Sequence, residues 1–149
     1  MAIIRSAITA AVAALCESSD AQEVEIMPRS DPGAFPALHI FDGGESPREA
    51  EAGTDRMEMD ITVEGYVERG AGQDPYDDLN ALHAWLVDAM AAEPPLGTTP
   101  AGPIAAVEIV ERGGLRISVA ELANQARLGF AQDFTITYSV VRGGMSQQI

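Results

Sequence analysis

Residues 56–68 alternate strictly between apolar and polar side chains. The apolar row consists of Met57, Met59, Ile61, Val63 and Val67, with Gly65 in the same row, and the polar row consists of Glu58, Asp60, Thr62, Glu64, Tyr66 and Glu68. Side chains of a strand point alternately to its two faces, so this pattern predicts one long strand with an apolar face and an acidic face. The fold must therefore cover the first face and leave the second either wet or packed against a partner.

Two other segments have the spacing of amphipathic helices. The first is predicted from about residue 3 to residue 15, with apolar residues at Ile4, Ile8, Val12 and Leu15. The second starts at Asp74, a good N-cap that is followed by Pro75 at the first helical position, and it runs to about residue 92. Its apolar stripe, which we expect to pack on the sheet, consists of Leu79, Leu82, Leu86 and Met90.

The remaining strands complete the expected fold. They are predicted at residues 23–27, 37–41, 104–111, 115–119 and 130–142, with Gly113-Gly114 as a turn and residues 120–125 as one helical turn. This order of elements fits an α+β fold in which a single antiparallel or mixed sheet has helices packed on one face. We expect one domain over residues 1–142 and a flexible C-terminal tail over residues 143–149.

Two stretches are predicted to be irregular loops. Asp42-Gly43-Gly44 ends the strand at 37–41, and the acidic residues 45–55 that follow have little periodicity, so we expect an exposed, mobile loop there. Residues 94–103 are rich in proline and glycine and are predicted to form the second loop.

The charge of the chain excludes one class of function. The formal net charge is −14, and all nine basic residues are arginine. A chain this acidic is not expected to bind nucleic acid by neutralising phosphates, because that contact depends on clusters of lysine and arginine. The acidity serves either solubility alone or a surface past which DNA slides without sticking.

No motif for catalysis or for a cofactor is found. The two histidines, His39 and His83, lack metal-ligand partners at local spacing, and Cys16 is the only cysteine, which excludes an internal disulfide and weakly favours a reducing compartment. Residues 70–75 fit neither the Walker pattern nor the dinucleotide fingerprint. No apolar run approaches the roughly 20 residues of a membrane span. We therefore expect no catalytic residue, no metal, no cofactor and no membrane partner.

The order of features resembles a known family over residues 2–142. The stretches that carry the resemblance are FPALHIFDGGE at 35–45, RMEMDITVEGYV at 56–67, DLNAL at 78–82 and GFAQDFTITY at 129–138. Together with the N-terminal helix and the two loops, they resemble the tail terminator (minor tail) proteins of long-tailed phages and of phage-derived gene transfer agents.

The resemblance implies a structural role without catalytic residues. Such proteins form a hexameric ring on the head-proximal end of the tail tube in the virion, after assembly in the host cytoplasm. They end tube polymerisation, and they offer the head-side connector or stopper a docking surface, while DNA passes through the ring. In such a ring, like charges repel DNA within about one Debye length, ~8 Å at physiological salt.

Two groups of residues are the candidates for such contacts. We expect the lumen or interface surface to include Glu58, Asp60, Glu64 and Glu68. We expect the two loops to contact the tube or the next subunit through Glu45, Glu49, Glu51, Pro94, Pro95 and Gly97. The alternatives are another neck or tail-completion protein of the same particle, or a small intracellular enzyme or ligand-binding domain with a pocket between sheet and helices.

Overall fold

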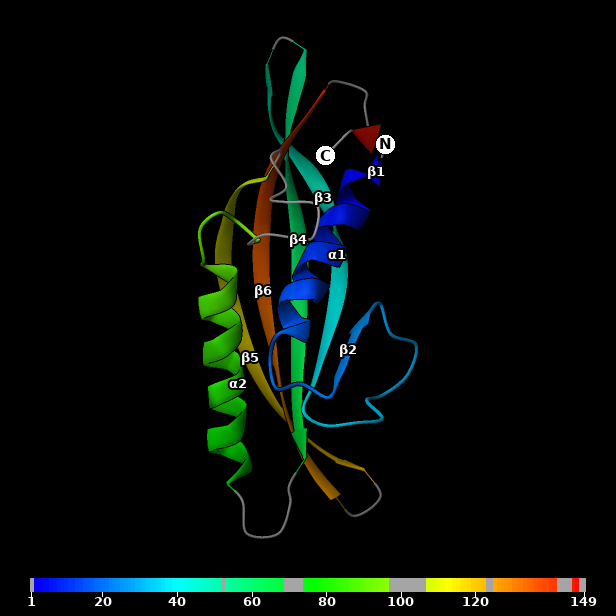
Figure 1. The fold of residues 1–149 in the computed structure, drawn as a ribbon, viewed down its shortest axis with the longest axis vertical. Coiled ribbons are helices and arrows are strands. Elements are labelled where there is room, and N and C mark those ends of the chain that lie inside the picture. The colour runs from blue at the N-terminus through cyan, green and yellow to red at the C-terminus, as the bar shows by residue number, and fades with distance from the viewer. Residues whose placement is uncertain are drawn as a thin grey trace.

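Two helices pack on one face of a five-stranded sheet (Figure 1). The computed structural model describes residues 2–51, 53–68, 74–96, 107–122, 125–141 and 146–147. In chain order the elements are β1 (Ala2–Ile3), α1 (Ile4–Glu17), β2 (Glu23–Ile26), β3 (Ala37–Glu51), β4 (Thr54–Glu68), α2 (Pro75–Met90), β5 (Val107–Leu122), β6 (Gln125–Val141) and β7 (Ser146–Gln147).

The strand order in the sheet is β2-β3-β4-β6-β5, with β4 at the centre. The β2 and β3 strands are parallel, and the other three pairs are antiparallel. The predicted α+β class with a single mixed sheet is therefore confirmed. The long strand predicted at 56–68 is also confirmed, since β4 pairs with β6 along its whole length, from Thr54↔Val141 to Glu68↔Arg127.

The core lies between the sheet and the helices. Helix α2 contacts β4 and β6, and α1 contacts β2, β3 and α2. The residues that fill this space include two predicted apolar rows together with one row of β6. They are Met59, Ile61, Val63 and Val67 of β4, Leu79, Leu82, Leu86 and Met90 of α2, and Phe134, Ile136, Tyr138 and Val140 of β6, all buried. The predicted N-cap is present as well, because the Asp74 carboxylate accepts hydrogen bonds from the backbone N–H of Tyr76 at 3.1 Å and of Asp77 at 3.2 Å.

The acidic loop predicted at residues 45–55 is wrong. Strand β3 continues through Glu45, Glu49 and Glu51, and it stays paired with β4 up to Glu51↔Thr54. The glycines that suggested a break form a β-bulge instead, since the register shifts between Asp42 and Glu45 and Gly44 has a φ of +99°. Glycine adopts this backbone conformation without steric cost, so it lets an extra residue enter the strand without ending it.

The turn predicted at Gly113-Gly114 and the helical turn predicted at 120–125 are also wrong. Strand β5 runs through both glycines to Leu122, with a register shift between Arg112 and Leu115, and β6 begins at Gln125. Two backbone carbonyls in this bulge find a partner in the buried Gln132, whose Nε2 donates to the oxygens of Gly113 at 2.8 Å and of Gly114 at 3.2 Å. The bulge is thus satisfied by a side chain of the neighbouring strand.

The chain ends meet in a second, two-stranded sheet. Ser146–Gln147 pair antiparallel with Ala2–Ile3. They are the only part of the tail predicted at 143–149 that the structure describes. Pro94 and Pro95 follow α2 outside regular secondary structure, whereas Gly97 lies outside the described residues.

The close approach of β4 and β6 depends on a glycine in the apolar row. Phe130 is the cross-strand partner of Gly65, and a Cβ built on Gly65 would lie 2.1 Å from Cε2 of the Phe130 ring. Gly65→Ala should therefore destabilise the fold by about 1–3 kcal/mol, because the buried ring must shift within a packed core. Urea unfolding followed by circular dichroism measures the change.

Gly114→Ala is the matched control for this substitution. Nothing lies within 4 Å of a Cβ at Gly114, which is also in a strand, so the free energy of unfolding should change by less than about 0.5 kcal/mol. Equal effects of the two substitutions would show that the Phe130 contact does not set the cost.

Candidate functional site

The face of the sheet opposite the helices, here called the outer face, carries the acidic row of β4. Because β4 alternates, the four carboxylates predicted to share a surface do lie on this one face: Glu58, Asp60, Glu64 and Glu68. None of them is buried: Asp60 is exposed, and the other three are partly exposed. The predicted grouping is thus present, and the neighbours of these carboxylates decide how much free charge they present.

Three of these carboxylates have partners on neighbouring residues. Glu58 lies 3.4 Å from the Arg48 guanidinium, Asp60 accepts a long 3.5 Å hydrogen bond from the Thr135 hydroxyl, and Glu64 accepts from the Tyr66 hydroxyl. The row therefore combines one neutralised carboxylate with carboxylates that keep their charge, because a hydroxyl partner does not cancel it.

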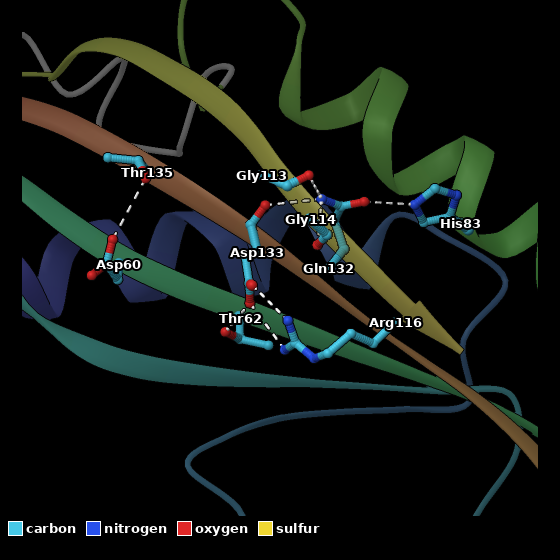
Figure 2. A network of polar contacts seen from close by, with 9 residues as sticks. All are labelled: Asp60, Thr62, His83, Gly113, Gly114, Arg116, Gln132, Asp133 and Thr135. Carbon is cyan, nitrogen blue, oxygen red and sulfur yellow. Dashed lines mark hydrogen bonds and ion pairs between the residues drawn. The ribbon is translucent and has the colours of Figure 1, made fainter. Parts of the chain in front are cut away.

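The centre of the outer face is a polar cluster around Asp133 of β6 (Figure 2). Its carboxylate accepts from the Thr62 hydroxyl at 2.7 Å and from the two guanidinium nitrogens of Arg116 at 2.7 and 3.2 Å. The Arg116 bonds first, and then the Thr62 bond, hold the pKa of Asp133 below its usual range. This residue contributes a fixed, paired charge rather than a titratable one near neutral pH.

The adjacent Gln132 points the other way, into the core (Figure 2). Besides its bonds to the β5 bulge, its Oε1 lies 2.8 Å from Nε2 of His83 on α2. This bond gives His83 a structural role, since it ties α2 to the bulged edge of the sheet. The alternation of β6 thus places a structural amide and a surface carboxylate on opposite faces.

A further ion pair binds β4 to β5. Both Arg56 and Ser139 contact Glu108, with the Arg56 Nη2 at 2.7 Å and the Ser139 hydroxyl at 2.6 Å. The Ser139 bond, followed by the Arg56 bond, lowers the pKa of Glu108. Arg48, Arg56 and Arg116 therefore form ion pairs with neighbouring carboxylates. This is expected for a surface that does not bind phosphate groups.

At the other end of the outer face, His39 is buried with 2% of its surface exposed. Its Nε2 lies 2.6 Å from Oε2 of Glu23, and its ring meets Tyr66 edge to face with centroids 5.7 Å apart. The Glu23 carboxylate also accepts from the backbone N–H of Gly33 at 3.0 Å. The bond to His39 is the main cause of the lowered pKa of Glu23.

A pocket of about 240 Å³ lies beside His39 on the outer face. The link between β2 and β3 forms one wall, and β3 and β4 form the other; its lining residues are Pro28, Arg29, Ser30, Asp31, Pro32, His39, Phe41, Glu64 and Tyr66. Sequence reasoning did not identify this pocket. The proline-rich link is the only local sequence feature that hints at the pocket. The pocket itself depends on the parallel pairing of β2 with β3, which local sequence does not reveal.

The edge of the sheet offers a different kind of surface. Among the described strands β5 has one neighbour only, and its side chains at Leu115, Ile117 and Val119 are 40%, 48% and 68% exposed. They stand opposite Gln132, Phe130 and Leu128 of β6, on the helix side of the sheet. An open strand edge with exposed apolar side chains is a site for pairing with another chain.

In the described part of the chain, Cys16 does not combine with either histidine into a triad. Cys16 is buried, and burial raises its pKa to about 12. The two histidines bond Glu23 and Gln132 rather than this thiol. Among the described residues, no helix is long and apolar enough to span a membrane. Comparison with protein-family models finds none that matches this chain, and comparison with curated proteins finds no match.

The Asp133 cluster predicts a specific pH dependence. Its folded-state pKa is lowered, so its contribution to stability is present above the unfolded carboxyl value of about 3.9 and is lost as the pH falls through the lowered value. Arg116→Gln should reduce stability at pH 7 only slightly, since the pair is solvent-exposed. The difference from the unsubstituted protein should shrink below pH 4 in urea unfolding.

Arg112→Gln is the control, because it removes the same charge from the same strand without touching this cluster. Nuclear magnetic resonance titration should show the pKa of Asp133 rising towards its ordinary value in the Arg116 variant alone. Equal titration curves in both variants would contradict the assignment.

Proposed function

We propose that this chain is a structural virion protein that forms a hexameric ring on the head-proximal end of a tail tube. The ring ends tube polymerisation and gives the head connector a docking surface, in a long-tailed phage or a phage-derived gene transfer agent. The resemblance of residues 2–142 to tail terminator proteins supports the proposal. The observation that carries it is the open apolar edge of β5.

A ring requires a surface through which each copy recruits the next. The β5 strand is 16 residues long, and it exposes Leu115, Ile117 and Val119 beside a backbone edge with which no other described strand pairs. Soluble monomers usually protect such an edge with charges, a bulge or a covering segment. In β5 the bulge lies between Arg112 and Leu115, and the stretch after it, which carries the three apolar side chains, is covered by no other described strand. The β5 edge therefore suits contact with a second subunit.

The acidic row suits the passage of DNA. With Glu58, Asp60, Glu64 and Glu68 towards the lumen, each copy would repeat the same carboxylates around the ring. Their repulsion acts within about one Debye length, ~8 Å at physiological salt. The sequence has no lysine, and Arg48, Arg56 and Arg116 on this face pair with carboxylates, which leaves them less available to hold a phosphate.

The two segments predicted to contact the tube or the next subunit keep this proposed role, although the first of them is a strand rather than a loop. Glu45, Glu49 and Glu51 belong to the β3–β4 hairpin, which extends beyond both helices (Figure 1). We propose that this hairpin, rather than a loop, contacts the tube or the next subunit, together with the segment after α2 that contains Pro94, Pro95 and Gly97. A neck or tail-completion protein would use similar surfaces, so the test must measure tail length.

A role as a small-molecule site has less support. The pocket beside His39 has a volume of about 240 Å³, below the roughly 300–1,000 Å³ of typical ligand sites. The pocket also lies on the outer face, whereas the alternative of an enzyme or ligand-binding domain predicts a pocket between the sheet and the helices.

Tail length tests the proposed function directly. Particles made without this chain should have tails of uncontrolled length in negative-stain microscopy, and adding back the chain should restore a uniform length and a sixfold ring. Ile117→Glu should fail to restore them, because it places a charge in the proposed subunit contact. Tyr76→Glu, which alters a side chain 57% exposed on α2, is the control and should restore both.

Two outcomes would overturn parts of this proposal. Uniform tails without the chain would exclude the terminator function and favour a neck or completion role. Uniform tails and rings with Ile117→Glu, at unchanged circular dichroism, would exclude the β5 edge as the contact.

The acidic row makes a separate prediction for assembled rings. Reversing charge with Glu58→Arg and Asp60→Arg should create rings that retain double-stranded DNA at low salt and release it at high salt, as expected for phosphate neutralisation. Filter binding measures this retention. The control pair Asp78→Arg and Asp88→Arg changes net charge equally on exposed positions of α2, and equal DNA retention by both pairs would refute a lumenal row.

A further inference from the structure

Glu23 and Glu25 of β2 and His39 of β3 bring three potential metal ligands to one point of the outer face. One ligand atom from each side chain lies within 4.8 Å of the other two. The parallel register explains this convergence, since Glu25 stands beside His39 and Glu23 stands beside Ala37. Two carboxylates spaced two residues apart therefore flank an imidazole on the neighbouring strand.

The imidazole is held where a metal ligand would be needed. The His39 side chain is 3% exposed, and its Nε2 faces Oε2 of Glu23 at 2.6 Å. Glu23 is itself fixed by the backbone N–H of Gly33. Metal binding would replace the hydrogen bond between Nε2 and Oε2 and release its proton to solvent. The Glu23 carboxylate would shift outward slightly, since bonds of about 2 Å from the ion to each ligand atom need more room than the 2.6 Å contact leaves. Glu25 is exposed, and it can close on the ion without rearrangement of the core.

The charge of this cluster differs from that of the carboxylates on the same face that pair with arginine. In the described part of the chain, arginine side chains pair with Glu58, Glu108 and Asp133. The ion pair of Glu23 is instead with His39, and among the residues that the structure describes no arginine pairs with Glu25. Two carboxylates are thus left with one imidazole in a chain of net charge −14, an arrangement that a dication would neutralise.

We propose that Glu23, Glu25 and His39 bind one divalent transition-metal ion, with Zn²⁺ the best match. One imidazole nitrogen with carboxylate oxygens suits Zn²⁺, Co²⁺ or Ni²⁺ better than Ca²⁺ or Mg²⁺, which prefer all-oxygen sites. Three protein ligands leave a fourth position for water or another ligand, and one of the three, His39, also lines the adjacent pocket. The ion would pin the four-residue edge strand β2 to β3. The inference does not depend on the proposed ring function.

The chain offers a clean test because it has two histidines and one cysteine, and the cysteine is buried. The full-length protein is treated with a chelator, dialysed and titrated with Zn²⁺ by calorimetry, and Co²⁺ is used for absorption spectra. We expect one Zn²⁺ per chain, an increase in melting temperature with Zn²⁺, and no displacement by a thousandfold excess of Mg²⁺ or Ca²⁺. In heteronuclear spectra the ring signals of His39 should shift on Zn²⁺ addition, while those of His83 stay in place.

Variants connect the binding to these residues. Glu25→Gln should weaken Zn²⁺ binding at least tenfold at an unchanged fold, since Glu25 lies at the surface, and His39→Asn should abolish the stoichiometric site. His83→Asn is the control and should bind as the unsubstituted chain does. Absence of Zn²⁺ binding by the folded protein, or binding that neither Glu25→Gln nor His39→Asn weakens, would overturn the proposal. If His39→Asn does not fold, Glu25→Gln decides.

Discussion

The pairing of β4 with both neighbours over nearly its full length governs the rest of the structure. Residues that stand opposite one another in neighbouring strands share a face, so the alternation of β4 fixes the orientation of β3 and β6 as well. The apolar row must be covered, and α1 and α2 provide that cover on one side only. The outer face remains polar for the same reason, because β4 presents its polar row there.

The glycines show why the sequence predicted too many breaks. Gly43-Gly44 and Gly113-Gly114 are typical turn signals, yet both pairs lie inside long strands at β-bulges. In each case a Cβ on the first glycine would crowd an aspartate of the neighbouring strand: Asp60 at 3.3 Å from Gly43, and Asp133 at 3.1 Å from Gly113. Glycine therefore serves a close approach between strands, and a single sequence cannot distinguish this from a turn without knowing the partner strand.

The candidate sites likewise divide into features that follow from local sequence, which could be predicted, and features that depend on distant strands, which could not. The shared face of Glu58, Asp60, Glu64 and Glu68 follows from local alternation, and so do the N-cap at Asp74 and the stripe of α2. The cluster around His39 does not, because it requires the parallel register of β2 and β3 across an irregular link. The exposure of Ile117 could not be predicted either, since it depends on how far α2 reaches across the sheet.

The two edges of the sheet are protected against pairing to different degrees. At one edge, β2 is only four residues long and places Glu23 and Glu25 on the outer face, and short, charged edge strands discourage pairing with another chain. At the other edge, β5 is four times as long. Of its charged residues, Glu108 and Arg116 pair with residues of β4 and β6, Glu111 lies 3.8 Å from Arg48 of β3, and Arg112 is exposed on the helix side. The β5 edge, with the exposed Ile117 at its side, is thus the less protected of the two, and the asymmetry favours a contact in which β5 of one copy approaches a different surface of the next. A contact of this head-to-tail kind closes into a ring when its rotation permits.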